Sequence, residues 1–397
     1  MQELSALLNQ LEESATLAMA RRSREMAEQG IDVISLSLGE PDFDVPDFIK
    51  EAAKEGVDKN FSKYPPVNGY LDLRMSIAHK FKRDNGLNYA ADQIVVSNGA
   101  KQSIANACLS LINPGQEVVL PAPYWVSYSE IVKMAGGVPV VIPTTIEQDF
   151  KITPEQLEAA ITPKTKLIIF SSPCNPSGSV FTHDELKALS QVVARHNNLY
   201  VISDEIYEHI NYTGQHFSMA ALPGMAERVI TVNGVSKAFA MTGYRIGYLG
   251  APTWIAKACS KVQGQFTSAP SSISQRAAKA AVDADPSEIS YMREAFLKRR
   301  DLVVSLLSEI SGLKVNQPPG AFYVLPDVTA LFGKSAGEWT INSADDLCEY
   351  ILDKAHVALV SGGAFGAPDC LRISYASSED TLRNAVQRIS QAIAELN

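Results

Sequence analysis

Residues 232–248 read VNGVSKAFAMTGYRIGY and place Lys237 among small and apolar residues, directly after a strand-forming run. Arg245 follows eight positions later. A lysine that is partly desolvated has a lowered pKa and becomes a nucleophile able to form a Schiff base with a carbonyl, whereas the plain alternative is a solvated surface lysine. Because the planar guanidinium of arginine binds phosphate, the pair points to an aldehyde that carries a phosphate.

The run that leads into this stretch, VITV at residue 229, is one of seven short apolar runs that alternate with helical patterns. The others are IVV at 94, EVVL at 117, VPVVI at 138, LIIF at 167, LYVIS at 199 and IGYL at 246. Parallel strands that are covered by helices on both faces have this continuous apolar character. The sequence therefore predicts an α/β fold with a large, mostly parallel seven-stranded sheet between helices.

A second, smaller domain is predicted from the C-terminal part of the chain. Long helical patterns begin at about residue 284, and the runs AFYVL at 321, VALV at 357 and LRISYA at 371 predict an α+β unit. The stretch 1–30 reads as an amphipathic helix and precedes the first strand of the main sheet, so we expect it to pack with this unit. We therefore predict a large domain over 46–289 and a small domain that combines 1–45 with 290–397.

Polar and aromatic residues follow the predicted strands, where open α/β sheets bind ligands. These loops are SNGAK at 97, PAPYW at 121, SSPCNPSG at 171, DEIYEH at 204 and NGVSK at 233. Asp204 either caps a helix or pairs with a protonated ring nitrogen, the contact that makes a pyridine ring an electron sink. Tyr207 and Asn175 are candidates to hydrogen-bond the phenolic oxygen of the same ring.

Two further loops offer weaker signals. Trp125 is either a core aromatic or a flat platform under a ring. Gly99 and Ala100 precede an amphipathic helix, and the backbone N–H groups of such a turn bind phosphate, although a simple turn explains the glycine equally well.

The composition limits the partners. The 397 residues include 44 acidic and 35 basic ones, for a net charge of -9, so nucleic acid and anionic membranes are not expected partners. The five cysteines are scattered without CxxC spacing, and no histidine is followed four residues later by a carboxylate, so neither disulfides nor a metal site is expected. We expect a cytoplasmic protein, because the start lacks the pattern of a signal peptide and no apolar run is long enough to span a membrane.

Together these residues resemble the class I and II aminotransferases, the pyridoxal 5'-phosphate enzymes of fold type I. The stretch GVSKAFAMTGYRIG is similar to their lysine signature. The similarity continues in family order through SLGEPDFD at 37, YPPVNGYLDLR at 64, SNGAK at 97, PYWVSY at 123, SSPCNPSG at 171, SDEIYEH at 203, GAFYVL at 320 and LRISYA at 371. It covers essentially the whole chain.

The resemblance implies a role for each of these residues. Lys237 would form the Schiff base, and Arg245, Gly99 and Ala100 would hold the cofactor phosphate. Asp204 would face the pyridine nitrogen, Asn175 and Tyr207 the ring oxygen, and Trp125 would stack on the ring. Tyr64 would reach the phosphate of the neighbouring subunit, which implies a homodimer with shared active sites. Arg372 and Gly39 would bind the substrate α-carboxylate, although without the resemblance a surface arginine at a strand end is the favoured interpretation of Arg372.

The substrate expectation rests on a narrower resemblance, to bacterial aspartate aminotransferases with Ser-x-Thr near the N-terminus. Here ESATLA at 13 supplies Thr16, and Lys101 opens a helix where a cation is unfavourable unless an anion lies nearby. The two residues would bind the distal carboxylate of aspartate or glutamate, the alternative for Lys101 being a solvated residue. Members that also use prephenate carry a basic residue where this chain has Glu12, so prephenate or aromatic transamination is the alternative function.

Other functional classes are alternatives to an aminotransferase. A lyase or decarboxylase on the same fold would keep the cofactor residues. A transcription regulator would need an added DNA-binding domain, for which there is no room before residue 30. A purely structural protein would leave the polar loop residues without a shared reason. The favoured expectation is transfer of the amino group of L-aspartate to 2-oxoglutarate.

Overall fold

Seven strands form one sheet in the order β2-β8-β7-β6-β5-β3-β4 in the computed structural model, which describes residues 4–397. β8 runs antiparallel to β2 and β7, and the remaining pairs are parallel. The strands are β2 (Ile94–Ser97), β3 (Glu117–Pro121), β4 (Val138–Ile142), β5 (Thr165–Ser171), β6 (Tyr200–Asp204), β7 (Val229–Gly234) and β8 (Gly247–Gly250). The predicted seven-stranded, mostly parallel sheet is confirmed, and each of the seven apolar runs contributes one strand.

Alternate residues of each strand enter two different cores. In β5, Leu167 and Ile169 pack with α4 (Ala100–Leu111), α5 (Ser127–Met134) and α8 (Thr253–Phe266) on one face. Ile168 and Phe170 pack with α3 (Leu71–Asn85), α6 (Pro154–Ala160) and α7 (His183–Arg195) on the other. Because successive side chains of a strand point to opposite faces, this explains why the runs are continuously apolar. Further helices, α2 (Asp47–Asp58) and α9 (Ser272–Asp283), pack together beside α3.

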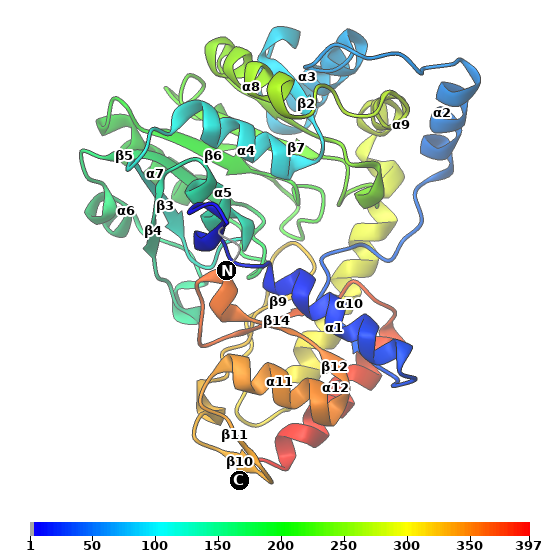
Figure 1. The fold of residues 1–397 in the computed structure, drawn as a ribbon, viewed down its shortest axis with the longest axis vertical. Helices are drawn as coiled ribbons and strands as arrows, with labels where there is room; N and C mark the ends of the chain where they lie inside the picture. Colours follow the sequence, from blue (N-terminus) through cyan, green and yellow to red (C-terminus); the bar gives the residue numbers. More distant parts are fainter. Residues whose placement is uncertain (1–3) are drawn as a thin grey trace.

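The second part of the molecule lies below this sheet in Figure 1 and carries three small sheets. These are β13 (Val360–Ser361), β14 (Leu371–Ser374) and β9 (Tyr323–Val324); β1 (Ile34–Ser35) with β12 (Val357–Ala358); and β10 (Ser335–Ala336) with β11 (Trp339–Thr340). Its helices are α10 (Ser290–Ser308), α11 (Ala344–Ala355) and α12 (Glu379–Ala394). The predicted smaller α+β domain is thus present, and the boundaries at residues 46 and 289 stay a prediction.

The N-terminal helix α1 (Ala15–Glu28) packs against β1, β12 and β13, as expected, and Figure 1 shows it beside the C-terminal part of the chain. The predicted extent of this helix is wrong, and residues 1–3 lie outside the described part. Before Ala15 the described chain has only a short 3-10 helix at Leu8–Gln10. The reason is that Ser14 is extended, while the N–H of Glu12 donates to Glu130 Oε2 on the large domain at 3.0 Å. This early segment is therefore held by the large domain.

The residues at the helix N-termini explain how each of two helices begins. At α7, the Thr182 hydroxyl accepts a hydrogen bond from the N–H of Glu185, and the Glu185 carboxylate accepts one from the N–H of Thr182 at 2.7 Å. This reciprocal capping satisfies N–H groups that have no partner inside the helix. α4 differs, since it begins after Gly99, which has no side chain to cap it. The first N–H groups of α4 are thus left available to a ligand. Among residues 4–397 there is no helix with the length and apolarity needed to cross a membrane.

Candidate active site

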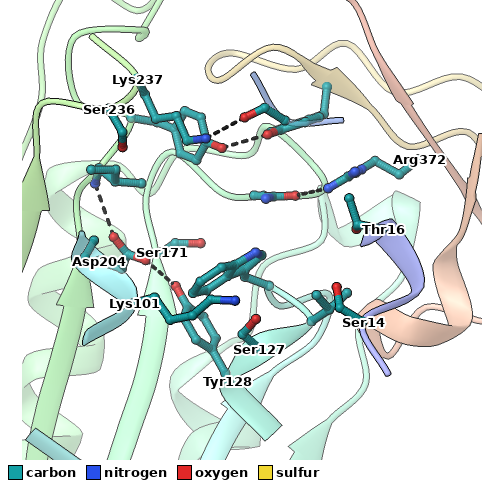
Figure 2. A pocket seen from close by; sticks show the side chains of 18 of the residues that line it. Ser14, Thr16, Lys101, Ser127, Tyr128, Ser171, Asp204, Ser236, Lys237 and Arg372 are labelled. Atoms are coloured by element: carbon teal, nitrogen blue, oxygen red, sulfur yellow. Dashed lines mark hydrogen bonds between the residues drawn. The ribbon is translucent and has the colours of Figure 1, made fainter. Parts of the chain in front are cut away.

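A cavity of about 210 Å³ lies at the carboxyl ends of the central strands, where the small domain meets the sheet. Figure 2 shows Lys237 and Asp204 on one side of it, Arg372 and Thr16 on the other, and Lys101 between them. All predicted site residues except Gly99 and Tyr64 line this cavity. The chain thus brings together side chains from its first twenty and its last thirty residues.

Lys237 follows β7, and its amine donates a hydrogen bond to the carbonyl oxygen of Gly39. Burial lowers the pKa of Lys237 to about 8, helped by Arg372 and Arg245 and opposed by Glu40. No carboxylate of residues 4–397 forms an ion pair with this amine. A much larger share of Lys237 is therefore unprotonated at about pH 8 than of an ordinary lysine, and the unprotonated amine is the form that acts as a nucleophile.

Asp204 is the last residue of β6 and is buried. One of its oxygens accepts a hydrogen bond from the Tyr128 hydroxyl at 2.7 Å, and the other accepts one from the N–H of Ile206 at 3.3 Å. Burial raises the pKa of Asp204 to about 6, although both hydrogen bonds oppose the rise. The interpretation of Asp204 as a helix cap is wrong, because residues 206–209 form turns and no helix follows. A cation next to this carboxylate would favour its ionised form.

Tyr207 and Asn175 line the same cavity, and the side chain of each is hydrogen-bonded to another side chain. The Tyr207 hydroxyl shares a hydrogen bond with the Tyr323 hydroxyl at 2.7 Å. Asn175 Oδ1 accepts a hydrogen bond from Arg372 Nη1 at 3.0 Å. The amide nitrogen of Asn175 and the hydroxyl of Tyr207 are thus held in fixed positions at the cavity wall.

The N-terminus of α4 and Arg245 form a cradle for an anion. Gly99 has a φ of +81°, and a Cβ added there would lie 2.3 Å from Arg245 Nη2. A Cβ on Gly247 would lie 2.1 Å from the backbone nitrogen of Ala100. Both glycines therefore keep free the space in which the Ala100 N–H and the guanidinium converge.

Arg372 in β14 is 1% exposed, so the reading as a surface arginine is wrong. Its guanidinium donates to the carbonyl of Ser37 and to Asn175, and its Nε has no partner within residues 4–397. Burial lowers the pKa of Arg372, against the opposing effect of Tyr323 and Tyr207. A buried cation without an anionic partner is costly, and a carboxylate ligand would supply that partner.

Lys101 lies at the open side of the cavity, with its ammonium 4.9 Å from the centre of the Trp125 ring. Burial of its stem lowers the pKa of Lys101, as does the charge of Arg245. Trp125 packs edge-on against Tyr128, with ring centres 5.6 Å apart. Thr16, near the start of α1, lines the cavity from the small domain. Lys101 and Thr16 therefore face the same space from the two domains.

Tyr64 lies outside the cavity and is 99% exposed, so its predicted role on a second subunit stays a prediction. Several lining residues did not enter the sequence prediction as site residues, among them Tyr128, Tyr323 and Ser236. Ser236 is the immediate neighbour of Lys237, and both tyrosines lie inside the stretches PYWVSY and GAFYVL that carry the resemblance. Their positions in those stretches are the sequence feature from which they could have been predicted as site residues.

The comparisons with known proteins point to a single family. Residues 31–389 match the family described as aminotransferase class I and II. The chain is 48% identical to the bifunctional aspartate aminotransferase and glutamate/aspartate-prephenate aminotransferase of Petunia hybrida, over 99% of this chain and 83% of that protein. It is 46% identical to the aspartate/prephenate aminotransferase of Cereibacter sphaeroides, over 99% of both chains.

A solved structure has the same fold along its whole length. The crystal structure of the aspartate aminotransferase from Rhizobium meliloti superposes with a TM-score of 0.96, at 42% identity and with 100% of both chains covered. The predicted fold type and the predicted family are therefore confirmed. The chain belongs to the aminotransferase class I and II family.

Proposed function

We propose that the protein is a pyridoxal 5'-phosphate enzyme that transfers the amino group of L-aspartate to 2-oxoglutarate, giving oxaloacetate and L-glutamate. The observation that carries the proposal is one cavity that joins a partly buried amine, Lys237, to a buried guanidinium without an anionic partner, Arg372. The amine suits an aldehyde and the guanidinium suits a carboxylate. The named relatives support the amino acid, since aspartate occurs in each of their names.

The residues present fit the cofactor. Gly99, Ala100 and Arg245 offer N–H donors to a phosphate, and Lys237 offers an amine to the aldehyde. Asp204 is a buried carboxylate with a raised pKa and no strong cationic partner, which a protonated ring nitrogen would provide. Asn175 and Tyr207 would reach the ring oxygen, and Trp125 would stack on the ring. When bound, pyridoxal phosphate supplies an aldehyde that condenses with amines and a ring that takes up electrons from the substrate Cα.

The protein residues would act around that group in defined ways. Lys237 Nζ would hold the cofactor until the substrate amine displaces it, and would then take the proton from the substrate Cα as a general base. Asp204 would keep a proton on the ring nitrogen. Arg372 and Gly39 would orient the α-carboxylate so that the Cα proton faces Lys237. The keto acid would leave before 2-oxoglutarate enters, which makes the kinetics ping-pong.

Selectivity for dicarboxylic substrates would come from Lys101 and Thr16. Both line the cavity, and Figure 2 shows Thr16 on the same side as Arg372 and Lys101 pointing into the open space. A distal carboxylate would offset the cost of a cation in the first turn of α4. The domain boundary at residues 45/46 then separates Thr16 from Lys101, and the substrate would bridge the two proposed domains.

The proposal includes a homodimer in the cytoplasm. Tyr64 is fully exposed and remote from its own cavity, as expected of a residue that completes the site of a second copy. The five cysteines are buried and unpaired, which suits a reducing compartment. Small amino acids and 2-oxoacids would be the partners, and no nucleic acid or membrane is proposed.

The first test is the absorbance spectrum of the purified protein with cofactor, before and after addition of L-aspartate alone. Conversion of the bound cofactor from its aldehyde to its amine form would support both cofactor and donor. Lys237→Ala should lose turnover by roughly 10²–10⁴-fold from proton transfer alone. Near-normal turnover of this variant would refute the assignment. Release of ammonia or carbon dioxide would instead indicate the lyase alternative.

Prephenate transamination is the second candidate, because the Cereibacter relative is named for it. Glu12 stands where a basic residue is expected for that substrate, and the next residue, Glu13, is paired with Arg21 at 2.6 Å. An acid in place of that base argues against prephenate as the main substrate. The test is to measure kcat/KM of the second half-reaction with prephenate and with 2-oxoglutarate as the amino-group acceptor. If the value for prephenate equalled that for 2-oxoglutarate, prephenate would be a main substrate.

A further inference from the structure

Tyr207 lies in a segment, residues 205–210, that follows Asp204 at the end of β6 and forms no helix or strand. The backbone hydrogen bonds of this segment are few: Glu205 N–H to Val232 O at 2.8 Å, Glu208 N–H to Glu205 O at 3.0 Å and Ile210 N–H to Tyr207 O at 2.8 Å. The backbone of Asp204 is held by its pairing in the sheet, but the chain directly after it is not. The position of Tyr207, and of the chain that leaves Asp204, therefore depends on contacts made by neighbouring side chains.

Those neighbours, Glu205 and Glu208, are buried in a polar cluster at the C-terminal end of α3. Glu205 is 1% and Glu208 6% exposed, and Lys80 of α3 is 2% exposed. The Lys80 ammonium contacts Glu208 Oε1 and donates to Asn85 Oδ1 at 2.8 Å. Asn85 Nδ2 lies 2.6 Å from Glu208 Oε2 and 3.0 Å from Glu205 Oε2. Two residues of α3 thus bind both carboxylates of the segment.

The cluster is closed by further donors around Glu205. Its carboxylate accepts hydrogen bonds from Ser203 Oγ at 2.9 Å and Ser218 Oγ at 2.5 Å, and His216 Nε2 lies 2.8 Å away. Although burial alone lowers the pKa of His216, the carboxylate of Glu205 raises it on balance. His209 and Asp84 lie at the rim, 3.2 Å from Glu208 and 3.8 Å from Lys80. Both buried carboxylates, Glu205 and Glu208, therefore contact hydrogen-bond donors or a cation inside the cluster.

A metal ion is a poorer explanation of this arrangement. Ligand atoms of Glu205, Glu208 and His216 do lie within 4.8 Å of one another. However, the Lys80 ammonium and the Asn85 amide already occupy the carboxylate oxygens that a cation would need. Since a buried ammonium repels a second cation, the geometry favours an ion pair over a metal site.

We infer that Lys80, through Glu208 and Asn85, is a positioning residue for the cofactor contacts of Asp204 and Tyr207. Glu205 directly follows Asp204 in the chain, and Glu208 directly follows Tyr207. A shift of either glutamate therefore moves the residue before it. Removal of one partner leaves a buried charge without compensation, and the segment moves to solvate it. The inference rests on the proposed function, because it takes the ligand at Asp204 and Tyr207 to be pyridoxal phosphate.

The test compares the holoenzyme with Lys80→Met. We expect the dissociation constant of the cofactor to rise roughly tenfold to a hundredfold, the range for residues that orient binding groups. The pH midpoint of the bound cofactor's absorbance should shift as well, because Asp204 and Tyr207 set its acidity. Lys80→Arg keeps a cation at this position, so its cofactor dissociation constant and pH midpoint should stay close to those of the wild type. If Lys80→Met does not fold, Ser218→Ala serves instead: it removes a hydroxyl that donates to Glu205 and accepts from Asn85, and it should shift both quantities in the same direction.

Val303→Ala is the control for loss of stability. Val303 is fully buried in α10, away from the cluster, so this variant should lower the melting temperature and leave the pH midpoint unchanged. An unchanged midpoint and affinity in folded Lys80→Met or Ser218→Ala would overturn the inference. A loss of cofactor affinity upon treatment with EDTA would overturn it in favour of a metal. A wild-type protein that binds no pyridoxal phosphate would instead refute the proposed function.

Discussion

Gly247→Ala should weaken phosphate binding at the N-terminus of α4 far more than it weakens the fold. The added Cβ would lie 2.1 Å from the backbone nitrogen of Ala100 and 2.4 Å from the carbonyl carbon of Gly99. Both atoms belong to the backbone, so no side chain can rotate away. Gly247 is paired with β2 and β7 on its two sides, at Ser97 and Gly234, and is therefore fixed by the sheet.

The size of the effect follows from these distances. Ordinary contact begins at 3.4 Å, so the start of α4 must move by about 1 Å, a displacement that costs roughly 10²-fold when it misplaces a binding group. Overpacking of this kind lowers the free energy of unfolding by about 1–3 kcal/mol. The variant should therefore stay folded but bind inorganic phosphate and the cofactor much more weakly.

Fluorescence titration of the cofactor and of inorganic phosphate, with thermal unfolding of the same samples, measures both effects. The matched control is Gly264→Ala in α8, where the added Cβ would meet only Val67 at 3.7 Å. This control should bind normally and gain about 0.5–1 kcal/mol of stability from the better helix former. If Gly247→Ala bound phosphate as tightly as the wild type, the assignment of the α4 N-terminus as the phosphate site would be refuted.

Three other outcomes are expected. Lys101→Ala should reduce kcat/KM for aspartate and glutamate by roughly tenfold or more, the worth of one hydrogen bond to a charged group, and leave alanine nearly unaffected; equal losses for all three would contradict its role. The rate at which the apoenzyme captures the cofactor aldehyde should rise with pH through about 8 and then level off, because only the unprotonated Lys237 amine reacts; a midpoint near 10.5 would show that burial does not lower this pKa. Tyr64→Phe should leave the melting temperature of the apoenzyme unchanged, since the side chain is 99% exposed, and should raise the cofactor dissociation constant roughly tenfold; an unchanged constant would remove Tyr64 from the site.

Much of the fold and of the site could be predicted because the signals are local in the chain. Each strand of the main sheet is a short apolar run, and Lys237 with Arg245 lies in a single stretch after β7. The start of α1 was predicted wrongly for the opposite reason, since Glu12 is held by Glu130, 118 residues away. No local pattern reports such a contact.

The same limit explains what was missed in the site. Asn175 is joined to Arg372 across 197 residues, and Lys80 to Glu208 across 128. Lys80 reads as an ordinary charged residue near the end of a helix, and only the packing of α3 against the segment after β6 buries it. Residues that line the cavity could therefore be predicted, whereas the packing of Lys80 against Glu208 appeared only in the structure.

The pairing of the two chain ends has a consequence for biosynthesis. Ile34 of β1 pairs with Val357 of β12, and Thr16 shares its cavity with Arg372. At the usual rate of translation, the N-terminal segment waits roughly 20 to 70 s for these partners to leave the ribosome. A nascent chain that has released residues up to Arg245 already holds Lys237 and Asp204 but lacks Arg372. The residues of this chain proposed to hold the cofactor are thus all synthesised before Arg372, the residue proposed to bind the α-carboxylate of the amino acid.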